Sequence, residues 1–384
     1  MRLQSLLSTL PGTQVVVRPD DSATAARRQV LLCPAHVPPG CSPDNWPPGL
    51  SRFVSSVALE SGEEPLRVVT LQQVQRYAEM TAAGALRLLL PADIPVPSAY
   101  EEVGHIVHLN LRDVQRPWGR LIGAVLLDKC PRARTIVNKL GMLTGPHRTF
   151  ALQLLAGAPE YVARVMENGC TFSVDMSAVY WNSRLGPERS RLVALWGPTD
   201  TVLDLCAGAG PIAVAAARAG ATVLANDVNP AATECLRANA VANGVAHSIT
   251  VFTGDGVQLA RGLLASDSPP RITQVVCNLP EHAPELVGAA LRRAFRRDTW
   301  GHDVQLPVCH VYAFSKADSP EEDILHRIAL ALDVSPDVLR LGSGKQGSGT
   351  GPLGAVAWTH VRDVAPGKAM LRASFRLPSV ASGL

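Results

Sequence analysis

From Thr201 onward, short apolar runs alternate with longer segments that carry apolar residues at helical spacing. Short apolar runs bounded by turn residues favour buried strands, and the amphipathic segments between them favour helices. This alternation predicts βα units and a doubly wound parallel sheet with helices on both faces. The predicted strands are 201–206, 221–227, 248–253, 273–278 and 307–314, and the predicted helices are 211–219, 230–243, 284–295 and 320–332.

The end of the chain has a different pattern. Two apolar runs, 355–364 and 369–378, are joined by Ala-Pro-Gly-Lys without room for a helix. Strands joined by so short a turn must run antiparallel. We therefore expect a closing hairpin after the parallel strands.

The first 95 residues contain short apolar pieces separated by proline and glycine, which indicates a small mixed domain without recognisable chemistry. The proline-rich segment Pro91–Tyr100 is typical of a linker. We divide the chain into residues 1–95, 96–178 and 179–384.

Composition narrows the class of protein. With 384 residues, 47% of them hydrophobic and 18% charged, the chain can bury a large core and is not wholly disordered. No apolar run approaches the length of a membrane span, so we expect no membrane partner. The eight cysteines form no C-x-x-C pair, which argues against a zinc ribbon and favours free thiols in a reducing compartment; we expect no metal.

Positive charge is concentrated in one stretch. Residues 112–148 contain eight basic and two acidic side chains, a net charge of +6 in a chain whose total is +3. A solvated basic face explains such a stretch without any function. Its position directly before a glycine-rich loop fits a module that grips phosphates.

The glycine-rich loop is D-L-C-A-G-A-G-P-I-A, residues 204–213, between a predicted strand and a predicted helix. Gly208 and Gly210 allow a ligand to approach the backbone closely at the start of the helix. By itself the loop also fits the dinucleotide pattern G-x-G-x-x-A.

Three carboxylates favour S-adenosyl-L-methionine over NAD as the cofactor. Asp204 ends the first strand, where a dinucleotide fold would have an apolar residue. Asp227 ends the second strand and can accept both hydroxyls of a ribose, and Asp255 can reach an adenine amino group. These carboxylates can accept hydrogen bonds from ribose hydroxyls and from an adenine edge. The pattern contains no group that would clamp a pyrophosphate.

The sequence N-L-P-E follows the fourth strand. Enzymes that methylate exocyclic amines have N-P-P-aromatic at this place, whereas here Leu279 replaces the first proline and no aromatic residue follows Pro280. We expect Asn278 and Pro280 to lie at the catalytic edge of the pocket, with a target nitrogen other than an exocyclic amine. A polar turn after a strand would explain Pro280 but not Asn278.

A series of longer motifs then identifies a family. In order they are GHIVHLNLR (104–112), LLDK (126–129), VNKLG (137–141), LLAG (154–157), ENGCTF (167–172), VYWNSRLGPER (179–189), ANDVNP (225–230), NLP (278–280), CHVYAF (309–314) and HVRDVAP (360–366). Together they resemble the archaeal and eukaryotic tRNA (guanine-37-N1)-methyltransferase family from about Pro97 to Pro378. The first 95 residues match poorly.

The resemblance implies a Rossmann-like, class I S-adenosyl-L-methionine-dependent methyltransferase domain over 179–384, with a mostly parallel seven-stranded sheet and the antiparallel hairpin. It implies a basic α+β RNA-binding domain over 96–178 and an N-terminal tRNA-recognition domain over 1–95. The implied reaction is methylation of N1 of guanosine 37, next to the anticodon, which supports reading-frame maintenance. We expect a monomer in the cytoplasm and nucleus, with the mitochondrial matrix as an alternative.

The resemblance also implies residue roles. Glu188 matches the family's general base, Arg148 the arginine that contacts guanine O6, and Tyr180 the aromatic residue that meets the flipped base. Without the resemblance these would be a helix-start charge, one more phosphate contact and an ordinary amphipathic residue. The implied cofactor contacts beyond Asp204, Gly208 and Gly210 are Arg189, Asp227, Val228, Asp255, Gly256 and Asn278.

Two other functions remain open from the sequence. A catalytically silent RNA-binding protein could keep this fold, but Asp204, Asp227, Glu188 and Asn278 are all present. A methyltransferase for small molecules or proteins would not explain the basic stretch or the long N-terminal extension.

Overall fold

The computed structural model describes residues 18–19, 28–29, 77–144, 149–295, 300, 305–341 and 356–382. The chain divides into two compact units, Met1–Glu79 and Met80–Leu384. The described elements of the first unit are the antiparallel strands β1 (Arg18–Pro19) and β2 (Arg28–Gln29) and the short helix η2 (Tyr77–Glu79). Among the described residues, no helix has the length and apolar content needed to cross a bilayer.

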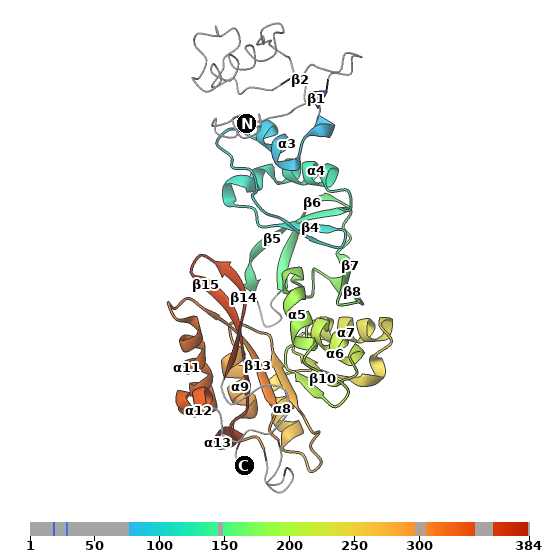
Figure 1. The fold of residues 1–384 in the computed structure, drawn as a ribbon. Coiled ribbons are helices and arrows are strands. Elements are labelled where there is room, and N and C mark those ends of the chain that lie inside the picture. Colours follow the sequence, from blue (N-terminus) through green and yellow to red (C-terminus); the bar gives the residue numbers. More distant parts are fainter. Residues whose placement is uncertain are drawn as a thin grey trace. The chain divides into compact units, whose positions relative to one another are not determined.

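The second unit begins with a small sheet of order β3-β4-β5-β6, which helices α3 and α4 cover (Figure 1). In α4, Ile122, Val125 and Leu126 are buried at helical spacing. Gly123 lets α4 pack tightly on β6, because a Cβ there would lie 2.7 Å from Leu155 Cβ. The elements are α3 (Ala82–Leu89), β3 (Glu101–Val103), β4 (Ile106–Leu109), η3 (Asp113–Trp118), α4 (Gly119–Lys129), β5 (Thr135–Thr144) and β6 (Thr149–Gly157).

The larger sheet has seven strands in the order β11-β10-β9-β12-β13-β15-β14. The first five strands of this order are parallel, whereas β15 pairs antiparallel with both β13 and β14. The strands are β9 (Thr201–Asp204), β10 (Thr222–Asp227), β11 (Ile249–Thr253), β12 (Gln274–Cys277), β13 (Val308–Ser315), β14 (Ala357–Ala365) and β15 (Lys368–Arg376).

Helices cover both faces of this sheet (Figure 1). Successive strand residues point to opposite faces, so the fully buried Val202 packs with α6 and α7 while its neighbour Leu203 packs with α8, α9 and α11. The helices are η4 (Ser183–Leu185), α5 (Gly186–Val193), α6 (Pro211–Arg218), α7 (Pro230–Ala242), η5 (Ala246–Ser248), α8 (Gly256–Leu264), α9 (Ala283–Leu291), α11 (Pro320–Leu332), α12 (Pro336–Leu341) and α13 (Ser379–Ser382).

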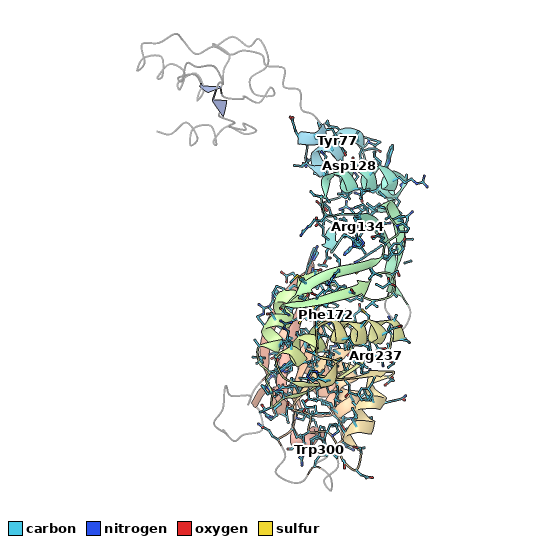
Figure 2. The ribbon with its side chains drawn as sticks, turned by 90° about the vertical axis from the view of Figure 1, so that its right-hand side faces the viewer. Tyr77, Asp128, Arg134, Phe172, Arg237 and Trp300 are labelled. Carbon is cyan, nitrogen blue, oxygen red and sulfur yellow. The ribbon has the colours of Figure 1, made fainter. Side chains whose placement is uncertain are left out.

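Between the two sheets lies a hairpin of β7 (Val162–Glu167) and β8 (Cys170–Asp175), which is joined to α7 by side-chain amides. Asn243 Oδ1 accepts a hydrogen bond from Thr171 N at 2.9 Å, and its Nδ2 donates to Thr171 O at 2.7 Å. Asn239 makes the same pair of bonds with Ser173, at 2.8 and 3.3 Å. The two asparagines thus satisfy the backbone of β8 as a neighbouring strand would. Phe172 of β8 and Arg237 of α7 are labelled in Figure 2.

The predicted alternation of strands and helices from Thr201 is confirmed, as is the closing hairpin. Helix α8 was not predicted, because it contains two glycines and buries only Ala260 and Leu264. The prediction of a linker at Pro91–Tyr100 is wrong. Pro95 O accepts a hydrogen bond from Gln115 at 2.7 Å, and neighbouring apolar residues pack against the core of the small sheet. The domain boundaries at 95/96 and 178/179 stay predictions.

Candidate active site

A cavity of about 730 Å³ opens at the carboxyl ends of the parallel strands. In open α/β sheets, ligands bind at this edge, where the order of the strands reverses direction. One wall consists of the loops that follow β9, β10, β11 and β12. The other wall comes from 95–101, from β4 and β5 of the small sheet, and from 179–185, with β14 and β15 closing one side.

The backbone of the glycine-rich loop adopts a conformation that requires glycine at two positions. Gly208 and Gly210 have φ values of 58° and 86°, in the left-handed region that favours glycine. Gly210 is the N-cap of α6, and a Cβ there would lie 2.7 Å from Cγ of Leu236, a fully buried side chain. Gly208 N donates a hydrogen bond to Asp227 Oδ2 at 2.8 Å, so the loop is held from the next strand.

Asp204 is a completely buried carboxylate on the wall of the cavity. Its Oδ1 accepts a hydrogen bond from Cys206 N at 3.3 Å, while Oδ2 has no hydrogen-bond partner among the described residues. Burial raises the pKa of Asp204 to about 7, and the nearby negative charge of Asp227 adds to the rise. A buried oxygen without a partner is unfavourable unless a ligand donates to it.

Asp227 and Asp255 complete an acidic wall. Asp227 Oδ1 accepts a hydrogen bond from Asn229 N at 2.9 Å, and the next residue, Val228, exposes 47% of its surface beside it. Asp255 is the N-cap of α8, with Oδ1 accepting from Gln258 N at 2.9 Å. Gly256 fits closely under this loop, because a Cβ there would lie 2.9 Å from the oxygen of Leu205.

Asn226 is a site residue for which the sequence analysis gave no role. It is buried on the wall of the cavity, and its Nδ2 donates to Leu205 O at 3.2 Å and to Gly254 O at 3.0 Å. One side chain therefore ties together the loops that carry two of the three aspartates. Its position at the end of an apolar strand, inside the ANDVNP motif, was the available signal.

Asn278 and Pro280 lie on the same wall, at the end of β12. Pro280 O accepts a hydrogen bond from Phe314 N at 3.1 Å, which fixes the N-L-P turn against the end of β13. The structure thus brings the predicted amide and proline to the edge of the cavity, beside the acidic loops.

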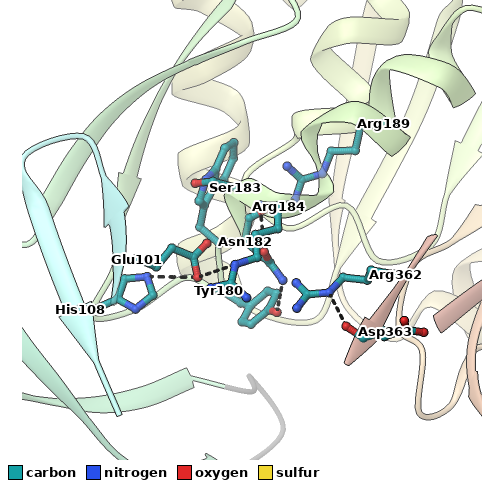
Figure 3. Close-up of polar contacts among 10 residues, drawn as sticks. Glu101, His108, Tyr180, Asn182, Ser183, Arg184, Arg189, Arg362 and Asp363 are labelled. Atoms are coloured by element: carbon teal, nitrogen blue, oxygen red, sulfur yellow. Dashed lines mark hydrogen bonds and ion pairs between the residues drawn. The ribbon is translucent and has the colours of Figure 1, made fainter. Parts of the chain in front are cut away.

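Tyr180, Asn182 and Arg184 lie on the opposite wall (Figure 3). Tyr180 is 44% exposed, and its hydroxyl accepts a hydrogen bond from Asn182 Nδ2 at 3.3 Å. Asn182 Oδ1 accepts from Arg184 N at 3.0 Å, which caps η4. Arg148, the predicted contact of guanine O6, lies outside the described residues.

Glu101 and His108 line the cavity next to Arg184. Glu101 Oε2 lies 3.8 Å from His108 Nε2 and 3.9 Å from Arg184 Nε (Figure 3). Burial lowers the pKa of His108 to about 3, and the charges of Lys139 and Arg184 act in the same direction, so this histidine is neutral at physiological pH.

The cavity therefore has two electrostatically different halves. Carboxylates occupy the ends of the parallel strands, whereas cations predominate on the facing wall, where Glu101 is the acidic residue among them. The acidic half contains Asp204, Asp227 and Asp255, and the basic half contains Arg112, Lys139, Arg184 and Arg362.

Glu188 is not among the residues that line the cavity. It is 2% exposed in the first turn of α5, where its Oε1 accepts a hydrogen bond from Tyr312 at 3.1 Å and lies 3.2 Å from Arg372 Nε. Its Oε2 accepts from Arg191 Nε at 3.0 Å. A buried carboxylate needs such partners, so in this conformation Glu188 ties α5 to β13 and β15.

Arg189 lines the cavity, but its guanidinium is engaged elsewhere. Nη1 donates to both carboxylate oxygens of Glu167, at 2.9 and 2.8 Å, and the group lies 5.0 Å above the centre of the Trp181 ring. Nη2 donates to Asn182 O at 3.2 Å. This arrangement positions the loop that carries Tyr180, and a direct cofactor contact of Arg189 stays a prediction.

The strand order, with an antiparallel pair at one edge, and the acidic ends of β9 and β10 beside a glycine loop define a Rossmann-like methyltransferase domain. Residues 163–303 match the family model described as the TRM5/TYW2 methyltransferase domain, and residues 85–160 match the TYW2 N-terminal domain. A protein of Phytophthora infestans named tRNA (guanine(37)-N(1))-methyltransferase is 36% identical over 316 residues, which are 82% of this chain and 72% of that protein. The chain belongs to the TRM5/TYW2 family.

Two further comparisons give the same picture. A grapevine protein named tRNA (guanine(37)-N(1))-methyltransferase 1 is 45% identical over 295 residues, which are 76% of this chain and 45% of that protein, so the chain spans about half the length of this relative. A solved complex of aTrm5 and tRNALeu has a TM-score of 0.60 and 22% identity and covers 80% of each chain. At that identity the likeness concerns the fold.

Proposed function

We propose that this chain transfers a methyl group from S-adenosyl-L-methionine to N1 of guanosine 37 in tRNA. The observation that carries the proposal is that one cavity combines an acidic half at the strand ends with a basic half that exposes Tyr180. A cationic cofactor rich in hydroxyl groups suits the first half, and a nucleotide with its phosphates suits the second. The names of the relatives support the same assignment.

The residue types of the acidic half suit S-adenosyl-L-methionine. Asp204 Oδ2 is buried without a partner among the described residues, which favours a donor supplied by a ligand. In the proposal, Asp227 accepts the ribose hydroxyls, Val228 packs on the adenine and Asp255 accepts from its amino group. Gly208 leaves room for these groups close to the backbone, because a Cβ there would meet nothing within 4 Å. When bound, the cofactor supplies an electrophilic methyl group.

The basic half would receive the target base. Tyr180 offers an exposed ring against which a flipped base can stack, as aromatic side chains do in RNA recognition. Asn278 and Pro280 would align the base with the cofactor from the opposite edge. Arg148 would stabilise the negative charge that develops on O6 when N1 loses its proton.

Glu188 is the proposed general base. The N1–H bond breaks as the new N1–methyl bond forms, and the proton passes to the carboxylate. Because Glu188 Oε2 is held by Arg191, whose side chain is 57% exposed, this role requires Arg191 to move away when RNA binds. Hydrogen bonds of catalytic groups often rearrange between the free enzyme and its complexes.

The function is tested by single-turnover transfer of labelled methyl to an unmodified tRNA transcript with guanosine 37, with a transcript carrying adenosine 37 as control. We expect incorporation only in the first transcript. Equal incorporation into both transcripts, or none into either while the protein binds the cofactor, would refute the proposal.

The role of Glu188 is tested in the same assay with Glu188→Gln. We expect the rate to fall by about 10²–10⁴-fold, the range for loss of a general base, with tRNA and cofactor affinities unchanged. Glu234→Gln on the exposed surface of α7 is the matched control. A Glu188→Gln protein that is less stable but equally active would assign the carboxylate a structural role only.

A further inference from the structure

Arg362 lies on the edge strand β14, at the point where its pairing with β15 becomes irregular. The register shifts between His360 and Arg362 and again between Asp363 and Ala365. Irregularities of this kind bend a strand and change the direction of its side chains, and they are common beside active sites. Arg362 lines the large cavity, from the strand pair β14–β15 that closes one of its sides.

The guanidinium of Arg362 has few partners. Its Nε donates to Asp363 O at 3.3 Å, and among the described residues no carboxylate lies within ion-pair distance of it. The carboxylate of Asp363 pairs instead with His360, 3.0 Å from its Nε2. Arg189 and Arg372 in the same region both have carboxylate partners. Arg362 therefore brings positive charge and free N–H donors to the cavity wall.

A second cation, Arg184, lies near the exposed ring of Tyr180. Figure 3 shows Arg184 and Arg362 on two sides of Tyr180. Arg184 is 52% exposed, and its nearest acidic group, Glu101 Oε2, is 3.9 Å from Nε, beyond hydrogen-bond distance. A base stacked on Tyr180 would thus lie near two guanidinium groups that make no hydrogen bond to a carboxylate among the described residues.

We propose that Arg362 binds a phosphodiester next to the nucleoside held at Tyr180 and so positions the target base. A planar guanidinium with two adjacent N–H donors matches two phosphate oxygens, which a lysine cannot do in the same way. This inference rests on the proposed function, because it assumes an RNA strand in the basic half of the cavity. It makes Arg362 a positioning residue that takes no part in proton transfer.

The first test measures tRNA binding by the full chain at several KCl concentrations, by fluorescence anisotropy of a labelled transcript. Arg362→Gln should weaken binding about tenfold or more, as for one charged hydrogen bond, and should lower the salt slope by about 0.7–0.9, the value for one phosphate contact. Arg362→Lys should keep the slope. Arg237→Gln, on α7 outside the cavity, should leave both affinity and slope unchanged.

The second test identifies the phosphate. Transcripts carry a neutral methylphosphonate at the phosphate 5′ or 3′ of nucleotide 37, one at a time. At one of these positions the methylphosphonate should weaken tRNA binding by the wild-type protein. The same methylphosphonate should not weaken tRNA binding by Arg362→Gln any further. An unchanged salt slope in Arg362→Gln, full additivity at both positions, or a loss of cofactor affinity instead of RNA affinity would each overturn the inference. Because wild-type transfer to guanosine 37 is measured separately, failure here is distinct from failure of the proposed function.

Discussion

Replacing Asp204 by asparagine should change the pH dependence of stability in a defined direction. The pKa of this carboxyl is raised from 3.8 to about 7 in the folded protein, chiefly by burial. The folded state therefore binds the proton more tightly than the unfolded state does. Stability is lost as pH rises from 3.8 to 7 and stays lower above pH 7. Asparagine is neutral throughout, so Asp204→Asn should not show this loss.

The magnitude follows from the two pKa values. Each unit of difference corresponds to about 1.4 kcal/mol, so the deprotonated carboxylate costs about 4 kcal/mol well above pH 7. Most of this difference develops between pH 5 and pH 8, where the stability of Asp204→Asn relative to wild type should rise by about 2.5 kcal/mol. A constant cost of about 1–3 kcal/mol is expected from the asparagine Nδ2, which has no partner where Asp204 Oδ2 stood.

Urea unfolding at pH 5 and pH 8, followed by circular dichroism, measures this difference directly. Asp318→Asn, an exposed substitution outside the cavity, controls for the change of buffer. A stability difference between Asp204→Asn and wild type that is equal at the two pH values would refute the argument. Calorimetry at pH 8 should show weaker cofactor binding by Asp204→Asn, since a neutral amide replaces the charged acceptor for the ligand.

Four other substitutions test separate parts of the structure. Asp227→Ala removes the acceptor of Gly208 N and should weaken S-adenosyl-L-methionine binding by about 2–3 kcal/mol in calorimetry; unchanged affinity would contradict the assignment. Gly210→Ala should destabilise the protein by about 2 kcal/mol or more, because of its positive φ and its contact with Leu236. Gly208→Ala, where a Cβ meets nothing within 4 Å, should cost less in the same urea experiment, and equal losses would argue against the packing explanation. Burial lowers the pKa of His310 from 6.5 to about 3, so the stability of the folded protein is lost as pH falls below 6.5. His310→Gln should flatten this pH dependence of stability by about 1.4 kcal/mol per pH unit between pH 4 and pH 6. An unchanged slope would mean that the histidine is not the group responsible.

Much of the acidic half could be predicted from the sequence. Asp204 and Asp227 each end a strand, and parallel strands place their carboxyl ends at one edge of the sheet. The glycines of the loop were recognisable because their spacing between a strand and a helix has a direct backbone reason. Local pattern and general topology were therefore sufficient to place the residues of the acidic half at one edge of the sheet.

The other half depends on contacts between distant segments, which local patterns do not encode. Pro91–Tyr100 looked like a linker because proline is common in linkers, yet part of it forms a cavity wall. Glu188 could be placed at a helix start, but its partner Tyr312 lies 124 residues later in the chain. Arg362 lies in a motif that matches the family, but no local pattern placed it at the cavity, because the irregular pairing that accompanies it is a property of two strands together.

Helix α7 contacts both the loops of the acidic half of the cavity and the β7–β8 hairpin. Its N-cap Asn229 is bonded to Asp227, its buried Leu236 packs against Gly210, and its last turn holds β8 through Asn239 and Asn243. A ligand that shifts the glycine loop would therefore also act on α7, the helix that holds the β7–β8 hairpin, and this hairpin leads to the small sheet. Any effect of cofactor occupancy on RNA affinity carried by this helix must be matched by an equal effect of RNA on cofactor affinity. Asn243, which holds β8 through Thr171 and is not among the residues that line the cavity, is thus the position at which this connection can be weakened without altering the cavity itself.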